Sequence, residues 1–173
     1  MFSRVLTPRG QGLAAAIGLA LAGLAAPLVL DPVPRLVWNA SASAPIGLWR
    51  ITPGATISVG DSVLVEPPRE ARRLAAQRHY LPANVPMIKT IAAVSGDTVC
   101  ARDAVVTINE RRVAVRRLAD RRGRKLPWWQ GCIRLSNGQV MLLNRAPDSF
   151  DSRYFGPVGK GAIIGKATPL WLR

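Results

Sequence analysis

A run of nineteen uncharged and mostly apolar residues, 12–30, constrains the folding of this chain more than any other feature. As a helix that rises about 1.5 Å per residue, the run would span roughly 28 Å, close to the thickness of a bilayer's hydrocarbon core. Arg4 and Arg9 precede the run and Asp31 follows it. The positive-inside rule therefore predicts a cytoplasmic N-terminus and an exported remainder.

A cleaved signal peptide is the alternative interpretation, because residues 42–44 (Ala-Ser-Ala) resemble a cleavage site. However, Pro45 would follow the cut directly, and the apolar run is long and ends well upstream of it. We therefore expect an uncleaved anchor. It would divide the chain into an N-terminus at 1–11, a transmembrane segment at 12–30 and an exported domain at 36–173.

The chain is strongly basic, with 24 Lys and Arg against 10 Asp and Glu and a formal net charge of +14. Such an excess suits nucleic acid, anionic lipid or an acidic protein, and composition does not choose among them. Half of the net charge lies in residues 111–125. We expect an exposed loop or an extended insertion there, apart from the segments that could carry chemistry.

Two cysteines, Cys100 and Cys132, and a single histidine exclude a zinc site of four Cys, or of two Cys and two His. Disulfides persist in exported proteins, so we expect the two cysteines to pair, with free buried thiols as the alternative. The bridge would enclose the most basic stretch of the chain.

Proline and glycine punctuate the chain after residue 30, and short runs of β-forming residues lie between them. This pattern predicts a mainly β, antiparallel structure. The expected strands are 48–51, 62–65, 87–94, 104–108, 140–143 and 162–165. Residues 139–143 follow Asn137-Gly138, which is typical of a turn, and look like the second arm of a hairpin. Residues 69–78 hold good helix formers, which predicts a short exposed helix.

Three polar segments could carry chemistry. Residues 39–49 are small and polar and, taken alone, are typical of a linker. Lys89 changes this interpretation, because it is the one charge in the apolar run 85–94. An edge-strand lysine commonly points to solvent, whereas a buried lysine loses its proton easily and can be the general base for a serine. Residues 148–157 could form a plain loop, or a support that fixes the lysine.

In their order and their residues, these segments resemble the type I signal peptidase family. Residues 41–43 (Ser-Ala-Ser) look like its nucleophile box, and Lys89 with the following 95–99 (Ser-Gly-Asp-Thr-Val) looks like its lysine box. Residues 149–156 are the most specific match. The Asn-x-Ser-x-Ser-x-Pro-x-Gly-Leu-Trp pattern that begins at residue 39 is similar to the branch of conjugative-transfer signal peptidases, the TraF peptidases.

The resemblance implies an antiparallel β-sheet catalytic domain of the signal peptidase kind in the periplasm, on one transmembrane helix in a bacterial inner membrane. It implies Ser43 as nucleophile and Lys89 as general base. The Ser43 backbone N–H and the Ser41 hydroxyl would bind the oxyanion. Ser41 stays a competing nucleophile, although its distance from Pro45 makes Ser43 the better match. No cofactor and no metal ion is implied.

The remaining implied roles concern the last segment, where Ser149 would hold the lysine, and Asp151 and Arg153 would pair and brace the loop. The family branch implies a serine endopeptidase that processes exported pilin precursors for conjugative plasmid transfer by a type IV secretion system, by hydrolysis or by cyclisation. The alternatives are a general type I signal peptidase and a non-catalytic assembly protein of the transfer apparatus.

The expected partners are the pilin precursor or another exported protein, inner-membrane lipid and other pilus-assembly proteins. The basic stretch 111–125 would then contact anionic headgroups or an acidic patch on an assembly protein. Nucleic acid is not expected, because an exported domain seldom meets it.

Overall fold

The computed structural model describes residues 8–30 and 33–173, and the side chains of 10–25 and 33–173. The chain forms two compact units, which divide between Val33 and Pro34.

Helix α1 (Pro8–Leu30) is the element of the first unit. It covers the predicted segment 12–30, so the helix itself is confirmed. In the part of the chain that the structure describes, no helix is long and apolar enough to cross a membrane. The expected membrane span is therefore not confirmed, and its last part, 26–30, lies outside the described side chains. Most of the expected cytoplasmic N-terminus, 1–7, lies outside the described residues as well.

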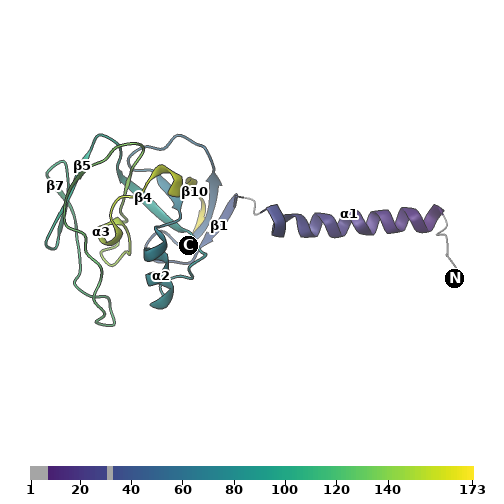
Figure 1. Ribbon diagram of the computed structural model, residues 1–173, viewed down its shortest axis with the longest axis horizontal. Helices are drawn as coiled ribbons and strands as arrows, with labels where there is room; N and C mark the ends of the chain where they lie inside the picture. The colour runs from purple at the N-terminus through teal and green to yellow at the C-terminus, as the bar shows by residue number, and fades with distance from the viewer. Residues whose placement is uncertain (1–7, 31–32) are drawn as a thin grey trace. The chain divides into compact units, whose positions relative to one another are not determined.

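The second unit is mainly β, as predicted, and its larger sheet has the order β1-β2-β10-β3-β4-β9 with antiparallel neighbours (Figure 1). Its strands are β1 (Leu36–Asn39), β2 (Gly47–Thr52), β10 (Ile163–Leu172), β3 (Ser62–Val65), β4 (Met87–Ala93) and β9 (Met141–Leu142). The C-terminal strand β10 thus lies between β2 and β3, while β1 forms one edge of the sheet.

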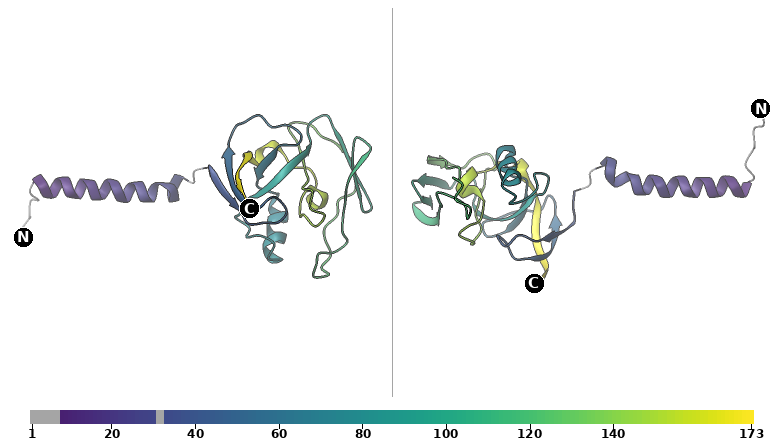
Figure 2. Two further views of the ribbon diagram at one scale, coloured as in Figure 1. Left: turned by 180° about the vertical axis from the view of Figure 1, so that it is seen from behind. Right: turned by 90° about the horizontal axis from the view of Figure 1, so that it is seen from below.

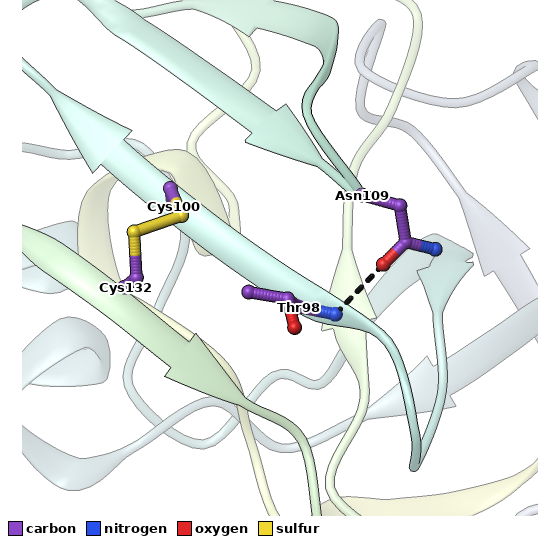
Figure 3. Close-up of a disulfide and its surroundings, with 4 residues drawn as sticks. All are labelled: Thr98, Cys100, Asn109 and Cys132. Carbon is purple, nitrogen blue, oxygen red and sulfur yellow. Dashed lines mark hydrogen bonds between the residues drawn. A yellow bond between two sulfur atoms is a disulfide. The ribbon is translucent and has the colours of Figure 1, made fainter.

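A smaller antiparallel sheet has the order β7-β6-β5-β8 and lies on the opposite side of this unit from β1 (Figures 1 and 2). Its strands are β7 (Arg111–Val115), β6 (Val105–Ile108), β5 (Thr98–Arg102) and β8 (Gly131–Arg134). Cys100 and Cys132 are register partners on β5 and β8 and form a disulfide, as predicted (Figure 3). In the turn from β6 to β7, Asn109 accepts the backbone N–H of Thr98 at 2.9 Å.

Short helices connect the strands: α2 (Arg69–Gln77), α3 (Ser152–Phe155) and the 3-10 helix η1 (Lys160–Ala162). The helix predicted at 69–78 is confirmed by α2, which buries Ala71 and Ala75 in one apolar cluster with Phe150 and Tyr154. This cluster ties α2 to the segment that leads into α3.

The inner strands β3 and β4 supply much of the core of the larger sheet. Val63, Leu64 and Val65 of β3 are fully buried, and Ile91 of β4 is 1% exposed. Burying such side chains contributes roughly 1.5–3 kcal/mol each. This packing fixes the position of the residues on β4, including Lys89 in the middle of the strand.

All six expected strands have a counterpart in the structure, whereas β1, β5, β7 and β8 were not expected. Strand β7 lies within the stretch 111–125, which was expected to be an exposed loop or an extended insertion. The expected hairpin around Asn137-Gly138 is wrong. The turn exists, but β8 before it pairs with β5, and β9 after it pairs with β4.

Candidate active site

The loop between β1 and β2 holds both candidate serines, and the side chain of Asn39 at the end of β1 orders it. Its Nδ2 donates to three carbonyl oxygens of the loop, those of Ser41 (2.9 Å), Ala44 (3.1 Å) and Pro45 (2.9 Å). Its Oδ1 accepts the N–H of Ser41 at 3.1 Å. What looked like a linker is therefore a turn held by one buried amide, a role that sequence reasoning missed.

Ser41 and Ser43 lie side by side in this turn, with their Oγ atoms 2.9 Å apart. The backbone N–H of Ser43 also donates to Ser41 Oγ at 3.4 Å. Ser43 Oγ lies 3.4 Å from the Nζ atom of Lys89. Among the described residues, no hydrogen bond joins Lys89 to Ser41, so the geometry favours Ser43 as the hydroxyl that the lysine activates.

Lys89 lies in the middle of β4, paired with Val63 of β3, and is only 2% exposed. The alternative of a solvent-facing edge lysine is therefore wrong. Burial lowers the pKa of the Lys89 ammonium to about 8, because leaving water disfavours the charged form. The nearby Asp151 carboxylate opposes this shift and Arg153 adds to it. The neutral amine is thus accessible slightly above neutral pH.

The loop before α3 supports the lysine. Ser149 is 1% exposed, and Lys89 Nζ donates to its Oγ at 3.0 Å. Asp151 and Arg153 are also buried and form a two-point ion pair, from Nε to Oδ1 at 2.7 Å and from Nη2 to Oδ2 at 3.0 Å. Such a pair is rigid, and removing one partner leaves the other charge buried alone. The structure thus brings the implied supporting residues together.

Asn144 completes this support and was missed by the sequence reasoning. Its Nδ2 donates to the carbonyl of Ile88 at 3.1 Å, and its Oδ1 accepts the N–H of Thr90 at 3.0 Å. It thereby holds the peptide groups on both sides of Lys89. Its own N–H donates to Asp151 at 3.0 Å. The available signal was a polar amide directly after an apolar strand.

A cleft of about 850 Å³ opens onto both Ser43 and Lys89. Part of the basic stretch 111–125 lines the same cleft, so the expectation that it lies apart from the chemical segments is wrong. The reason is that the chain after β7 folds back toward α2, where Arg78 donates to the carbonyl of Lys125 at 2.6 Å. The arginines that line the cleft are Arg78, Arg117, Arg121, Arg122 and Arg124.

These groups can perform acyl transfer. A neutral Lys89 amine can accept the proton of the Ser43 hydroxyl, whose oxygen can then attack a carbonyl carbon in the cleft. A serine beside a buried lysine, on a β-rich fold, is the arrangement typical of the class of serine peptidases that use a lysine in place of a histidine.

The family comparison agrees with this class. A family model described as "Signal peptidase, peptidase S26" matches residues 9–172. The chain belongs to the peptidase S26 signal peptidase family, a family of serine peptidases. The resemblance inferred from the three segments is therefore confirmed.

Several relatives bear names from conjugation. The chain is 37% identical over 139 residues to "Probable conjugal transfer protein TraF" of Sinorhizobium fredii, which covers 75% of this chain and 73% of that protein. It is 32% identical over 143 residues to "Conjugal transfer protein TraF" of Agrobacterium fabrum, and the alignment covers 77% of this chain and 80% of that protein. It is 33% identical over 144 residues to "Plasmid transfer protein TraF" of Escherichia coli, and the alignment covers 76% of this chain and 80% of that protein. The predicted likeness to the TraF branch is confirmed.

Among solved structures, a signal peptidase I from Enterococcus faecalis aligns with a TM-score of 0.36 and 19% identity. The alignment covers 66% of this chain and 98% of that chain.

Proposed function

We propose that this chain is a Ser-Lys endopeptidase that processes exported protein precursors, pilin precursors in particular, during conjugative transfer. The observation that carries the proposal is the 3.4 Å contact between Ser43 Oγ and the Nζ atom of Lys89, a lysine buried in β4. Membership of the signal peptidase family supports the reaction class, and the relatives named as conjugal transfer proteins support the setting.

In the first step of the proposed reaction, the Lys89 amine takes the proton of the Ser43 hydroxyl while Oγ attacks the scissile carbonyl carbon. The backbone N–H of Ser43 and the Ser41 hydroxyl, which already adjoin each other, would stabilise the oxyanion. The carbon–nitrogen bond then breaks, and the Lys89 ammonium gives its proton to the leaving amine. An ester between the substrate's acyl group and Ser43 remains.

The second step needs an acceptor for the acyl group. If water attacks, Lys89 takes one of its protons, the ester bond breaks, and the Lys89 ammonium returns the proton to Ser43 Oγ as the acid product leaves as a carboxylate. If the neutral N-terminal amine of the precursor attacks in place of water, Lys89 takes its proton and passes it to Ser43 Oγ in the same way, a peptide bond replaces the ester, and the product is cyclic. The two products differ by one water molecule, so intact-mass spectrometry distinguishes hydrolysis from cyclisation.

Strand β1 offers a docking edge for an extended substrate. It is an edge of the larger sheet, its residues 37–39 line the cleft, and it leads directly into the serine loop. An extended peptide can add to such an edge through main-chain hydrogen bonds. In this proposal the substrate backbone would run along β1 toward Ser43.

The proposed place of action is outside the cytoplasm. The disulfide between Cys100 and Cys132 supports this, because oxidising compartments preserve such bonds. The single-pass anchor in a bacterial inner membrane, the periplasmic position and the lipid and pilus-assembly partners stay predictions from the sequence.

The test is maturation of a co-expressed pilin precursor, read by intact-mass spectrometry, in the variants Ser43→Ala and Lys89→Met. We expect no mature product with either, although circular dichroism should show both folded. The matched controls are Ser58→Ala and Lys160→Met, which change exposed residues outside the cleft and should process normally.

Normal maturation in both site variants would overturn the proposal. Conjugation that persists with Ser43→Ala would favour a non-catalytic assembly protein. Equal cleavage of ordinary secretory precursors by the unmodified chain would favour a general signal peptidase.

A further inference from the structure

The proposed reaction leaves one wall of the cleft without a role. This wall is the basic arm, defined here as residues 116–126, which extends beyond β7 as a long green loop in Figures 1 and 2. Ala119 and Lys125 form an isolated bridge within it, and the N–H of Leu126 donates to the carbonyl of Leu118 at 2.9 Å. The arm is therefore an ordered hairpin-like element.

Asp120 fixes the tip of the arm. Its Oδ1 accepts the backbone N–H groups of Arg122 at 2.9 Å and Arg124 at 3.0 Å, which closes the turn. The hydroxyl of Tyr80 donates to the other carboxylate oxygen, and Arg124 donates to the carbonyl of Arg78 at 3.3 Å. These contacts dock the tip on the chain that follows α2, so the arm forms a wall of the cleft in a defined position.

The charge of the cleft is unbalanced. Five arginines and two aspartates line it. Asp120 is already paired with Arg124 at 2.7 Å, and Asp148 is paired with Arg121.

Arg117 and Arg122 differ from the other arginines of the cleft. Both are exposed, and within the part of the chain that the structure describes neither guanidinium has an ion-pair partner. Both line the cleft that contains Ser43 and Lys89. A concave site with an excess of one charge concentrates its field on the ligand that enters it.

We propose that the basic arm determines substrate choice: the cleft takes an extended peptide whose acidic side chains pair with Arg117 and Arg122 while its scissile bond lies at Ser43. This inference rests on the proposed function, because it takes Ser43 as the point of attack. An arginine guanidinium matches a carboxylate with two parallel hydrogen bonds, so each pair adds both affinity and register. The shared cleft favours a peptide over a lipid headgroup, which would need no contact with Ser43.

The first experiment measures binding without catalysis, in the full chain carrying Ser43→Ala. The probes are short fluorescently labelled peptides with an uncharged Ala-Ser background that contains two Glu, two Gln or two Lys residues, and binding is measured by fluorescence anisotropy. We expect the Glu peptides to bind at least about tenfold more tightly than the Gln peptides. This difference in affinity should shrink as the salt concentration rises, because salt screens the charges. Adding Arg117→Glu and Arg122→Glu should abolish this preference.

The matched control adds Arg102→Glu and Arg134→Glu, which change the net charge equally at exposed positions outside the cleft. It should keep the preference for Glu peptides. Equal binding of Glu and Gln peptides, or a preference that survives in the arm variant, would overturn the inference. So would an arm variant that loses binding to phosphatidylglycerol vesicles but keeps its peptide preference, because the arm would then be a lipid contact.

The second experiment is the precursor maturation assay with the arm variant on the active chain. We expect kcat/KM to fall at least about tenfold, with the control variant unaffected. A failure of the proposed function is visible separately, as normal maturation with Ser43→Ala, whereas a failure of this inference leaves Ser43 essential and the arm variant as active as the control.

Discussion

Ser149 Oγ lies 3.0 Å from Lys89 Nζ, nearer than Ser43 Oγ at 3.4 Å. A neutral amine has two N–H donors and one lone pair, so Lys89 can donate to Ser149 while its lone pair accepts the proton of Ser43. An ammonium group has three donors and no lone pair, and it cannot accept that proton. The contact with Ser149 therefore orients the base, and the base works only when deprotonated.

Peptidase activity should rise with pH through about 8. Burial lowers the pKa of Lys89 to about 8, so the neutral base is scarce below that pH and predominates above it. We expect kcat/KM to increase about tenfold per pH unit well below the pKa and to level off above it. The measurement is a pH profile with a peptide substrate from about pH 6 to about pH 10. A profile that is flat below pH 8 would contradict the role of Lys89.

Ser149→Ala should lower kcat about 100-fold with little change in KM, because a misplaced base slows proton transfer without altering substrate binding. Ser149→Thr, which keeps the hydroxyl, should recover part of the lost rate. Steady-state kinetics on the three proteins tests this. Equal kcat values for the Ala and Thr variants would show that the hydroxyl has no positioning role.

Lys89→Met should abolish activity and increase stability at neutral pH. The pKa of Lys89 is about 8 in the folded chain and near its ordinary value of 10.5 in the unfolded chain. The buried ammonium therefore costs stability in full below pH 8, and the cost disappears as pH rises past the unfolded value. Chemical denaturation should show a gain of up to roughly 3 kcal/mol at about pH 7 and a smaller gain at about pH 10. A variant that is less stable at neutral pH would contradict this.

Asp151→Asn should strongly destabilise the fold, by about 3–5 kcal/mol, because Arg153 is 3% exposed and would remain charged without its partner. The control is Glu66→Gln. Glu66 is half exposed and its Oε1 lies 3.5 Å from Arg72 Nη1, so losing this ion pair should cost less than about 1 kcal/mol of stability. Thermal or urea unfolding measures both. Similar losses in the two variants would show that the buried pair has no special structural role.

Local sequence patterns predicted the strands whose apolar residues are buried in the core, such as β3 and β4, and the helix α2. They did not predict β7, because Arg111 and Arg112 are typical of an exposed loop. The strand forms because Asn109 and Glu110, both at positive φ, turn the chain back so that it pairs with β6. Strand β8 is exposed along its length and so carries no burial pattern. Both β7 and β8 form because they pair with neighbouring strands, β6 and β5, in the folded chain.

The site was predictable only in part for a similar reason. Ser43 and Ser149 lie 46 and 60 residues from Lys89 along the chain, and only the family resemblance linked them beforehand. Asn144 has no motif of its own, since its role follows from lying opposite the peptide groups around Lys89. The basic arm is distant from the serine loop in sequence, and only the folded chain reveals that they share a cleft.

The central claim is that Ser43 attacks the substrate with Lys89 as its base, and trapping the acyl-enzyme tests it most directly. Full-length protein would be mixed with excess substrate, quenched in acid within the first turnover and analysed by peptide mapping with mass spectrometry. We predict an added acyl mass on the Ser43 side chain, and none in Lys89→Met. Turnover with the acyl group on Ser41, or with no acyl group on the protein, would contradict the claim.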